Sequence, residues 1–276
     1  MKKILVPTDF SQEAQYALEA AASLARKFKA EIFLLHMLDM PFSLIDPVGG
    51  EAKNKFPESI FYMKLAHKKF TELKQQEFLK DIQITEAVQF NYAFKGITAF
   101  ANENNCDLIV MGSHGTSGFK DVFVGSNSEK VVRSSEKPVL VIKKQPTNFT
   151  IKKILLAIDK EIDNQNSLNK AINFAKLMNA ELHLVFVNTP NNFVTSKEAY
   201  TEIEKLVKKE DLESLKTHIY NDVNIEEGIL NFAEDLNADV IALSTHGRKG
   251  LAHFFNGSIS EDVANHANKP VLTFKI

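Results

Sequence analysis

The stretch MGSHGTSG at residues 111–118, followed by GS at 125–126, recurs as LSTHGRKG at 243–250 with GS at 257–258. Seven of the eleven glycines of the chain lie in these two stretches. Each stretch follows a short apolar run and precedes a helical pattern. A glycine-rich turn between a strand and a helix presents backbone N–H groups at the helix N-terminus, where they bind anions, most often phosphate.

The two stretches belong to an internal duplication. MKKILVPTD at residues 1–9 and IKKILLAID at 151–159 are identical at five of nine positions, at an offset of 150, and residues 125–142 and 257–274 at nine of eighteen, at an offset of 132. The second copy therefore lacks 18 residues, and the segment with no counterpart is predicted to be a loop at Asp39–Pro57. A polar linker at Lys144–Thr150 divides the chain into domains 1–147 and 148–276.

Strands alternate with helices in both copies. In copy one, strands are predicted at Lys3–Val6, Glu31–Met37, Gln83–Phe90, Leu108–Met111 and Val139–Ile142, with helices from Ser11, a plausible N-cap, to Phe28 and over Ser59–Leu79, Ile97–Glu103 and Ser126–Ser134. In copy two, strands are predicted at Ile154–Ile158, Glu181–Val187, Lys216–Tyr220, Val240–Leu243 and Val271–Phe274, with helices over Ser167–Met178, Lys197–Lys209, Ile225–Leu236 and Ser258–Ala267.

Near-continuous apolar strands between helices predict the fold class. The class is α/β, with two doubly wound, Rossmann-like domains, each built on a five-stranded parallel sheet that helices cover on both faces. Ligands of such sheets bind beyond the carboxyl ends of the strands, and both glycine stretches follow a strand at that edge.

The composition is that of a globular protein of balanced charge. The net charge of −2 gives no reason to expect nucleic acid or an anionic membrane as a partner. A single cysteine, Cys106, excludes an intramolecular disulfide and is interpreted as a small buried residue. The chain begins with a poor secretory signal and has no apolar run of membrane-spanning length, so we expect a cytoplasmic protein.

The glycine spacing differs from that of the best-known phosphate loops. It is neither a Walker A loop nor the dinucleotide fingerprint. In copy one, the first two glycines bring the backbone close to a ligand, and Gly125 with Ser126 opens the next helix. The alternative is that these glycines only shape turns, which their recurrence in both copies makes less attractive.

Residues at the strand ends have two interpretations each. Asp9 and Asp159 end the first strand of each copy, where a carboxylate either binds a ribose hydroxyl or a base substituent, or caps the following helix. Met37 and Val187 end the second strands, where they either meet a base or simply pack.

Histidines occupy one matching position of both loops, His114 and His246. No paired carboxylate is evident, so a polar, phosphate-facing role is favoured over catalysis, and no catalytic residue is predicted. His36 lies within an apolar strand and is interpreted as a core histidine whose hydrogen bonds are satisfied.

The chain resembles the universal stress protein family in its tandem, two-domain form. The resemblance rests on five blocks of copy one, repeated in copy two from Ile154 to Phe274: ILVPTD at 4–9, LHM at 35–37, MGSHG at 111–115, GS at 125–126 with SEKV at 128–131, and KPVLV at 137–141. It implies that the two domains form a pair related by pseudo-two-fold symmetry.

The resemblance also implies an ATP site, because members of the family with the full glycine pattern bind ATP. Asp9 would then hold the ribose or adenine side, and Met37 would meet adenine through its main chain. The residues that would line the ribose and phosphates are Met111, Gly112, Gly115, Gly125, Ser126 and Asn127, and the corresponding positions of copy two are Asp159, Val187, Gly247, Gly257 and Ser258. Mg²⁺ would accompany the triphosphate, although no carboxylate cluster is visible that would hold it and no protein metal site is predicted.

The function expected from the resemblance is that of an ATP-binding stress-response protein, which acts as a nucleotide-dependent regulatory or binding module rather than an enzyme. Slow ATP hydrolysis, protein partners and a homodimer remain open. The alternatives are an ATP-using enzyme on a related fold and a binder of a lipid or another small molecule. Ser244 stands where copy one has Gly112, so copy one is expected to be the better nucleotide site.

Overall fold

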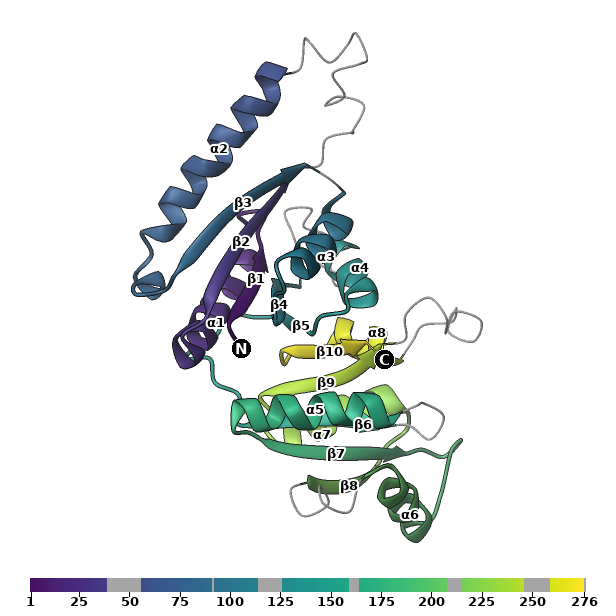
Figure 1. Ribbon diagram of the computed structural model, residues 1–276. Coiled ribbons are helices and arrows are strands. Elements are labelled where there is room, and N and C mark those ends of the chain that lie inside the picture. Colours follow the sequence, from purple (N-terminus) through teal and green to yellow (C-terminus); the bar gives the residue numbers. More distant parts are fainter. Residues whose placement is uncertain are drawn as a thin grey trace. The chain divides into compact units, whose positions relative to one another are not determined.

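The structure is a computed structural model (Figure 1), and it describes residues 1–38, 56–90, 92–113, 126–158, 164–207, 215–245 and 259–275. The chain divides into two compact units, Met1–Phe149 and Thr150–Ile276, which are described separately below. Each unit contains one copy of the sequence repeat.

The first unit is built on a parallel sheet in the order β3-β2-β1-β4-β5. Its elements are β1 (Lys3–Pro7), α1 (Gln12–Phe28), β2 (Glu31–Leu38), α2 (Phe56–Lys74), a 3-10 turn (Glu77–Leu79), β3 (Ile84–Phe90), α3 (Ala93–Glu103), β4 (Leu108–Gly112), α4 (Ser126–Ser134) and β5 (Val139–Ile142). The central strand β1 lies between β2 and β4, with Ile4 opposite both Ile32 and Leu108.

The second unit repeats this plan with the order β8-β7-β6-β9-β10. Its elements are β6 (Lys153–Ile158), α5 (Asn164–Met178), β7 (Glu181–Asn188), α6 (Ser196–Leu206), β8 (Leu215–Asn221), α7 (Ile225–Asp235), β9 (Val240–Thr245), α8 (Ile259–His266) and β10 (Val271–Lys275). The predicted α/β class, with a five-stranded parallel sheet in each copy, is confirmed. The strand order reverses beside β1 and beside β6, which is where doubly wound sheets bind ligands.

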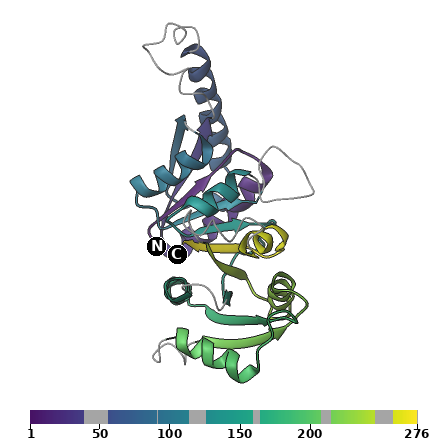
Figure 2. The ribbon, with the colours of Figure 1, turned by 90° about the vertical axis from the view of Figure 1, so that its right-hand side faces the viewer.

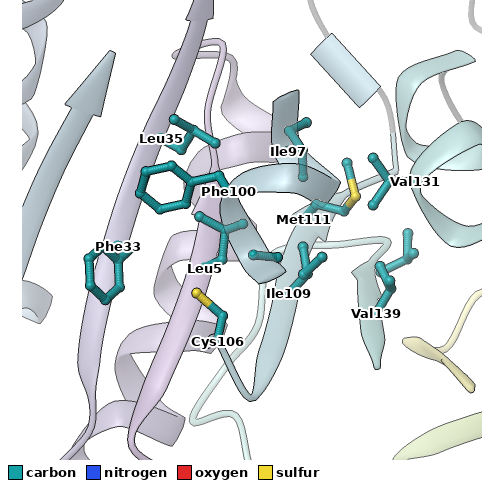
Figure 3. Close-up of a cluster of buried hydrophobic side chains, with 12 residues drawn as sticks. Leu5, Phe33, Leu35, Ile97, Phe100, Cys106, Ile109, Met111, Val131 and Val139 are labelled. Atoms are coloured by element: carbon teal, nitrogen blue, oxygen red, sulfur yellow. The ribbon is translucent and has the colours of Figure 1, made fainter. Parts of the chain in front are cut away.

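Helices cover both faces of the first sheet. On one face, α3 and α4 pack against alternate residues of β1, β2, β4 and β5 in a cluster that includes Leu5, Ile97 and Val131 (Figure 3). Helix α1 packs on the other face, against β1, β2, β4 and β5. Cys106 belongs to the cluster, and burial raises the pKa of its thiol to about 11, so it is a neutral buried residue, as predicted.

Helix α1 begins where the sequence predicts. Ser11 is its N-cap, and the Ser11 hydroxyl accepts a hydrogen bond of 3.2 Å from the backbone N–H of Ala14. This bond satisfies one of the N–H groups that the first turn of a helix leaves unpaired. The cap therefore fixes the position where the chain turns from β1 into α1.

The prediction for the segment after β2 is wrong in part. Helix α2 starts at Phe56, inside the predicted loop, because proline is well tolerated in a first helical turn and Pro57 is the second residue. The helix ends at Lys74, and the 3-10 turn follows it. Since α2 has 19 residues and α6 has 11, eight of the 18 extra residues lengthen this helix.

Helix α2 leaves much of its apolar surface exposed. Ala66 and Phe70 are buried, but the large apolar side chains nearer its start are exposed: Ile60, Phe61, Tyr62, Met63 and Leu65. This part of the helix runs past the ends of β2 and β3 (Figures 1 and 2). The helix predicted in this segment is therefore present, but its first part leaves large apolar side chains exposed.

Candidate functional site

The candidate site of the first unit lies at the carboxyl edge of its sheet. Six predicted site residues lie there or directly beside it. Asp9 follows β1, Met37 is near the end of β2, and Met111 and Gly112 end β4. Ser126 and Asn127 open α4, the helix that follows β4. The strand pairing aligns these strand ends, because β1 pairs with both β2 and β4.

The turn between β1 and α1 is held by its own side chains. The backbone N–H of Phe10 donates to the Thr8 hydroxyl at 3.0 Å, and that of Ser11 donates to Asp9 Oδ1 at 3.0 Å. Phe10 adopts a left-handed backbone conformation with φ of 64°, which is uncommon for a residue other than glycine. Ser11, and not Asp9 as the capping interpretation proposed, is therefore the N-cap of α1, and Asp9 supports the residue before the helix. The contact of Asp9 with a ligand stays a prediction.

Aromatic side chains support the same turn from the other side. The Phe10 ring lies 4.6 Å from the His36 ring and 5.3 Å from the Phe70 ring, between centroids. His36 Nδ1 is 2.8 Å from the Thr8 carbonyl oxygen, which requires an Nδ1–H donor. Burial is the largest cause of the lowered pKa of His36. The Nδ1 hydrogen bond agrees with the prediction, but His36 is half-buried and is not the core residue that was predicted.

Gly112 is required by packing at the end of β4. A Cβ atom at this position would lie 2.6 Å from the Glu13 carbonyl oxygen and 2.7 Å from the Glu13 carbonyl carbon. Both are backbone atoms in the first turn of α1, so the contact cannot be relieved by a side-chain movement. The first glycine of the motif therefore lets the chain leave the sheet directly against the start of α1.

Ser128 links the two sides of the glycine stretch. Its hydroxyl donates a buried hydrogen bond of 2.8 Å to the carbonyl oxygen of Gly112. The N-terminus of α4 is thereby held beside the end of β4, and its first-turn N–H groups and positive dipole end lie at the sheet edge. The sequence reasoning missed this role, although the serine recurs as Ser260 in the second copy and was visible as a repeated GSxSE pattern.

The side chains at the ends of the second strands point into the core. Met37 is partly buried against the α3–α4 cluster. Val187 is 5% exposed, and a Cβ at Gly228 of α7 would lie 2.4 Å from Val187 Cγ1, so α7 packs closely on this side chain. The packing interpretation thus describes both side chains. Only the main-chain N–H and C=O groups of these residues are then available to contact a ligand.

A cationic residue, Lys143, also lies at this edge of the first sheet. Lys143 directly follows β5, whose last residue, Ile142, accepts a hydrogen bond of 3.1 Å from the N–H of Ser113. Burial lowers the pKa of the Lys143 ammonium to about 8, which still leaves it mostly charged at pH 7. Lys143 was not singled out in the sequence, since a lysine after a strand carries no motif.

Several predicted residues lie outside the described ranges. They are Gly115, Gly125, Asp159, Gly247, Gly257 and Ser258, together with His114 and His246. Ser244 is described and lies within β9, opposite Phe274 of β10. In the second unit the structure therefore places Val187 and Ser244 but brings together no complete set of the predicted residues.

Both halves of the chain match one protein-family model, described as the universal stress protein family, over residues 1–143 and 150–275. The chain belongs to the universal stress protein family. The two matches confirm the tandem form that the resemblance predicted. They also place the strand ends and glycine stretches of both units within recognised family domains.

Relatives that match the whole chain and relatives that match about half of it support the assignment to the universal stress proteins. The chain is 27% identical to universal stress protein Slr1230 of Synechocystis over the full length of both chains. It is 32% identical to universal stress protein MJ0577 of Methanocaldococcus jannaschii over 52% of this chain and 96% of that protein. The crystal structure of a universal stress protein from Archaeoglobus fulgidus superimposes with a TM-score of 0.72, and the match covers 99% of this chain and 98% of that one. The two sequences are 22% identical, so this match shows a similarity of fold.

The described ranges contain neither a metal-binding cluster nor a membrane-spanning helix. Within those ranges, no group of three or more His, Cys, Asp or Glu side chains is arranged to hold a metal ion. No helix in the same ranges is both long enough and apolar enough to cross a membrane.

Proposed function

We propose that the first unit of this universal stress protein binds ATP at the carboxyl edge of its sheet and acts as a nucleotide-dependent regulatory module. The observation that carries the proposal is the Ser128–Gly112 hydrogen bond, which sets the start of α4 against the end of β4. The glycine stretch then connects a strand end to a helix N-terminus at the point where the strand order reverses. Phosphate binds at such places in doubly wound sheets.

The main chain of β2 suits the adenine end of the ligand. The Leu35 carbonyl accepts a hydrogen bond from Thr8 N–H on the β1 side. Since main-chain groups alternate in direction along a strand, the N–H and C=O of Met37 face the same side, beyond the last residue of β1. These groups, with the Asp9 carboxylate nearby in the chain turn, are the groups that the family resemblance assigns to the adenine and ribose.

The proposed module is not a fast enzyme. A Mg²⁺ ion would accompany the triphosphate through its phosphate oxygens, since the described residues offer no carboxylate cluster for it. The two alternatives are an ATP-using enzyme and a binder of a lipid or other small molecule. Native mass spectrometry of the purified protein separates them by the mass of any co-purified ligand. Multiple-turnover ATP consumption would favour the enzyme.

Replacing Asp9 separates its two roles. We expect Asp9→Ala to weaken ATP binding roughly tenfold, the effect of losing one charge-assisted hydrogen bond. It should also destabilise the unit by about 1 kcal/mol, because the bond from Ser11 N–H at the helix start is lost. Asp9→Asn keeps an acceptor for that bond, so it should retain the stability and lose affinity. Calorimetric titration with MgATP and urea unfolding measure the two effects, and unchanged affinity in both variants would remove Asp9 from the site.

A further inference from the structure

A chain of hydrogen-bonded ionisable side chains crosses β7 and β8 of the second unit. Glu181 Oε2 is 3.2 Å from His183 Nε2, and His183 Nδ1 is 3.0 Å from His218 Nε2. Lys216 Nζ lies 2.9 Å from the same oxygen of Glu181. His183 is 4% exposed. Glu181, His183 and His218 are called the carboxylate–histidine chain below. Glu181 and His183 lie in the amino-terminal half of β7 and His218 lies at the middle of β8, away from the carboxyl edge of the sheet.

The two imidazole rings meet edge to edge. Their planes are 12° apart and their centroids 5.2 Å apart, while the facing nitrogens are 3.0 Å apart. This geometry suits an N–H of one ring pointing at the lone pair of the other. With both rings neutral, His218 Nε2–H donates to His183 Nδ1, and His183 Nε2–H donates to Glu181. The lone pairs do not converge on a third point, as a metal ion would require.

The first unit shows that the fold does not need this polar chain. The strand registers pair Phe33 with Thr85 and His183 with Lys216, so Phe33 occupies the position of His183. In the same way Ala87, opposite Leu35, occupies the position of His218, opposite Val185.

The covering helix is equivalent in the two units as well. Phe100 of α3 packs on Phe33 with centroids 5.7 Å apart, and Phe232 of α7 packs on His218 at 4.9 Å. Apolar packing therefore fills these positions in one copy, and titratable groups have replaced it in the other.

Charges on each neighbouring element act on the carboxylate–histidine chain. Glu181 of β7 favours a positive charge on His183, while Lys216 of β8 and Lys153 of β6 oppose it. From the side of α7, the Phe232 ring covers His218, and Asp235 accepts a hydrogen bond of 2.9 Å from the Tyr220 hydroxyl. Burial is the largest cause of the lowered pKa of both histidines, so the pair is neutral at pH 7.

The carboxylate–histidine chain accommodates one added proton but not two. A proton on His183 leaves Nε2–H donating to Glu181 and Nδ1–H donating to Nε2 of His218, provided that the proton of His218 moves to its Nδ1 atom. A second proton sets two N–H groups against each other and places two cations side by side. The bond between the rings is then lost, and His218 is driven from its place under α7.

We propose that the carboxylate–histidine chain is an acid-sensitive switch that loosens β8 and α7 from the second unit when protons are taken up. The proposal is independent of nucleotide binding. Because the folded-state pKa values are lowered, the loosened state binds more protons than the folded one. The contribution of the pair to stability is complete above the ordinary histidine value of 6.5 and is lost as the pH falls through the folded-state values.

Hydrogen exchange of the full chain at pH 7.5, 6.0 and 5.0, corrected for the intrinsic rate, tests the switch. We expect protection of residues 215–221 and 225–235 to fall roughly tenfold across this range, because the loosened state takes up protons more readily than the folded one. Residues 84–90 and 93–103 of the first unit should keep their protection, which provides an internal control.

The matched variants use the residues of the first unit. His183→Phe combined with His218→Ala should abolish the loss of protection, whereas His67→Gln, an exposed histidine of the first unit, should leave it unchanged. Loss of protection at the same pH in the double variant, or constant protection in the unaltered protein, would overturn the proposal.

A second measurement holds even if the double variant does not fold. Ring-nitrogen NMR of the unaltered protein should show both histidines titrating below 6.5, with the proton of His218 changing nitrogen as the first proton binds. Glu181→Gln removes the carboxylate that favours the charged ring, so it should move the transition to lower pH. Independent titration of the two rings at ordinary values would refute the switch.

Discussion

Gly112→Ser is expected to destabilise the first unit by about 3 kcal/mol, the upper range for overpacking a well-filled site. The Cβ of the serine would lie 2.6 Å from the carbonyl oxygen of Glu13, which belongs to the backbone of α1. Either α1 or the end of β4 must shift. Asp9 lies just before α1 and Met111 lies at the end of β4, so either movement disturbs the proposed ATP site. We therefore expect the affinity for MgATP to fall together with the stability.

The second unit supplies the reciprocal control for this substitution. Ser244 occupies the position of Gly112, so Ser244→Gly removes a side chain where one is already accommodated. It should cost only about 0.5–1 kcal/mol, the usual effect of glycine within a strand. Urea unfolding followed by mass-resolved hydrogen exchange assigns each loss to its unit. Equal stability of Gly112→Ser and the unaltered protein would show that the contact with Glu13 relaxes freely.

Ser128→Ala is expected to cost about 2 kcal/mol, because it leaves the buried carbonyl of Gly112 without its hydrogen-bond donor. The start of α4 would no longer be held against β4, and its N–H groups would lose their fixed direction. The affinity for MgATP should fall by a larger factor than in a variant that affects stability alone. Urea unfolding and calorimetric titration measure the two losses.

The control for Ser128→Ala lies on the same helix. Ser134 donates a hydrogen bond of 2.6 Å to the Lys130 carbonyl at an exposed position, so Ser134→Ala removes the same chemical group without leaving a buried acceptor. Its stability and its affinity for MgATP should stay close to those of the unaltered protein. If the two serine variants behave alike, the Ser128–Gly112 bond does not organise the site.

The order of strands and helices was predictable from the sequence, since apolar runs and the repeat act over short ranges. The boundaries of the individual helices were less predictable. Helix α3 begins at Ala93 and not at the predicted Ile97. The corresponding helix α7 was predicted to begin at Ile225, where the structure has it. Applying the 132-residue offset to that start would have given Ala93.

The candidate site was predictable only as a set of strand ends. The sequence predicts that Asp9, Met37 and Gly112 share the carboxyl edge, because parallel strands align their ends. It does not reveal that Gly112 contacts Glu13 or that Ser128 bonds to Gly112, since both contacts depend on how helices dock on the sheet. The histidine pair was missed for the same reason, because His183 and His218 are 35 residues apart and become neighbours only through the register of β7 and β8.

The pairing of β1 with β4 has a consequence for the synthesis of this protein. Ile4 lies opposite Leu108, and the backbone N–H of Lys3 binds the Asp107 carboxylate, 104 residues away in the chain. Strand β1 is therefore synthesised first, but it cannot pair with β4 until most of the unit has been translated and β4 has left the ribosome. Contacts so distant in the chain close slowly. A nascent chain stalled before Leu108 would therefore expose the apolar strand Lys3–Pro7 to chaperones, while one extended past Ile142 has every strand of its first sheet.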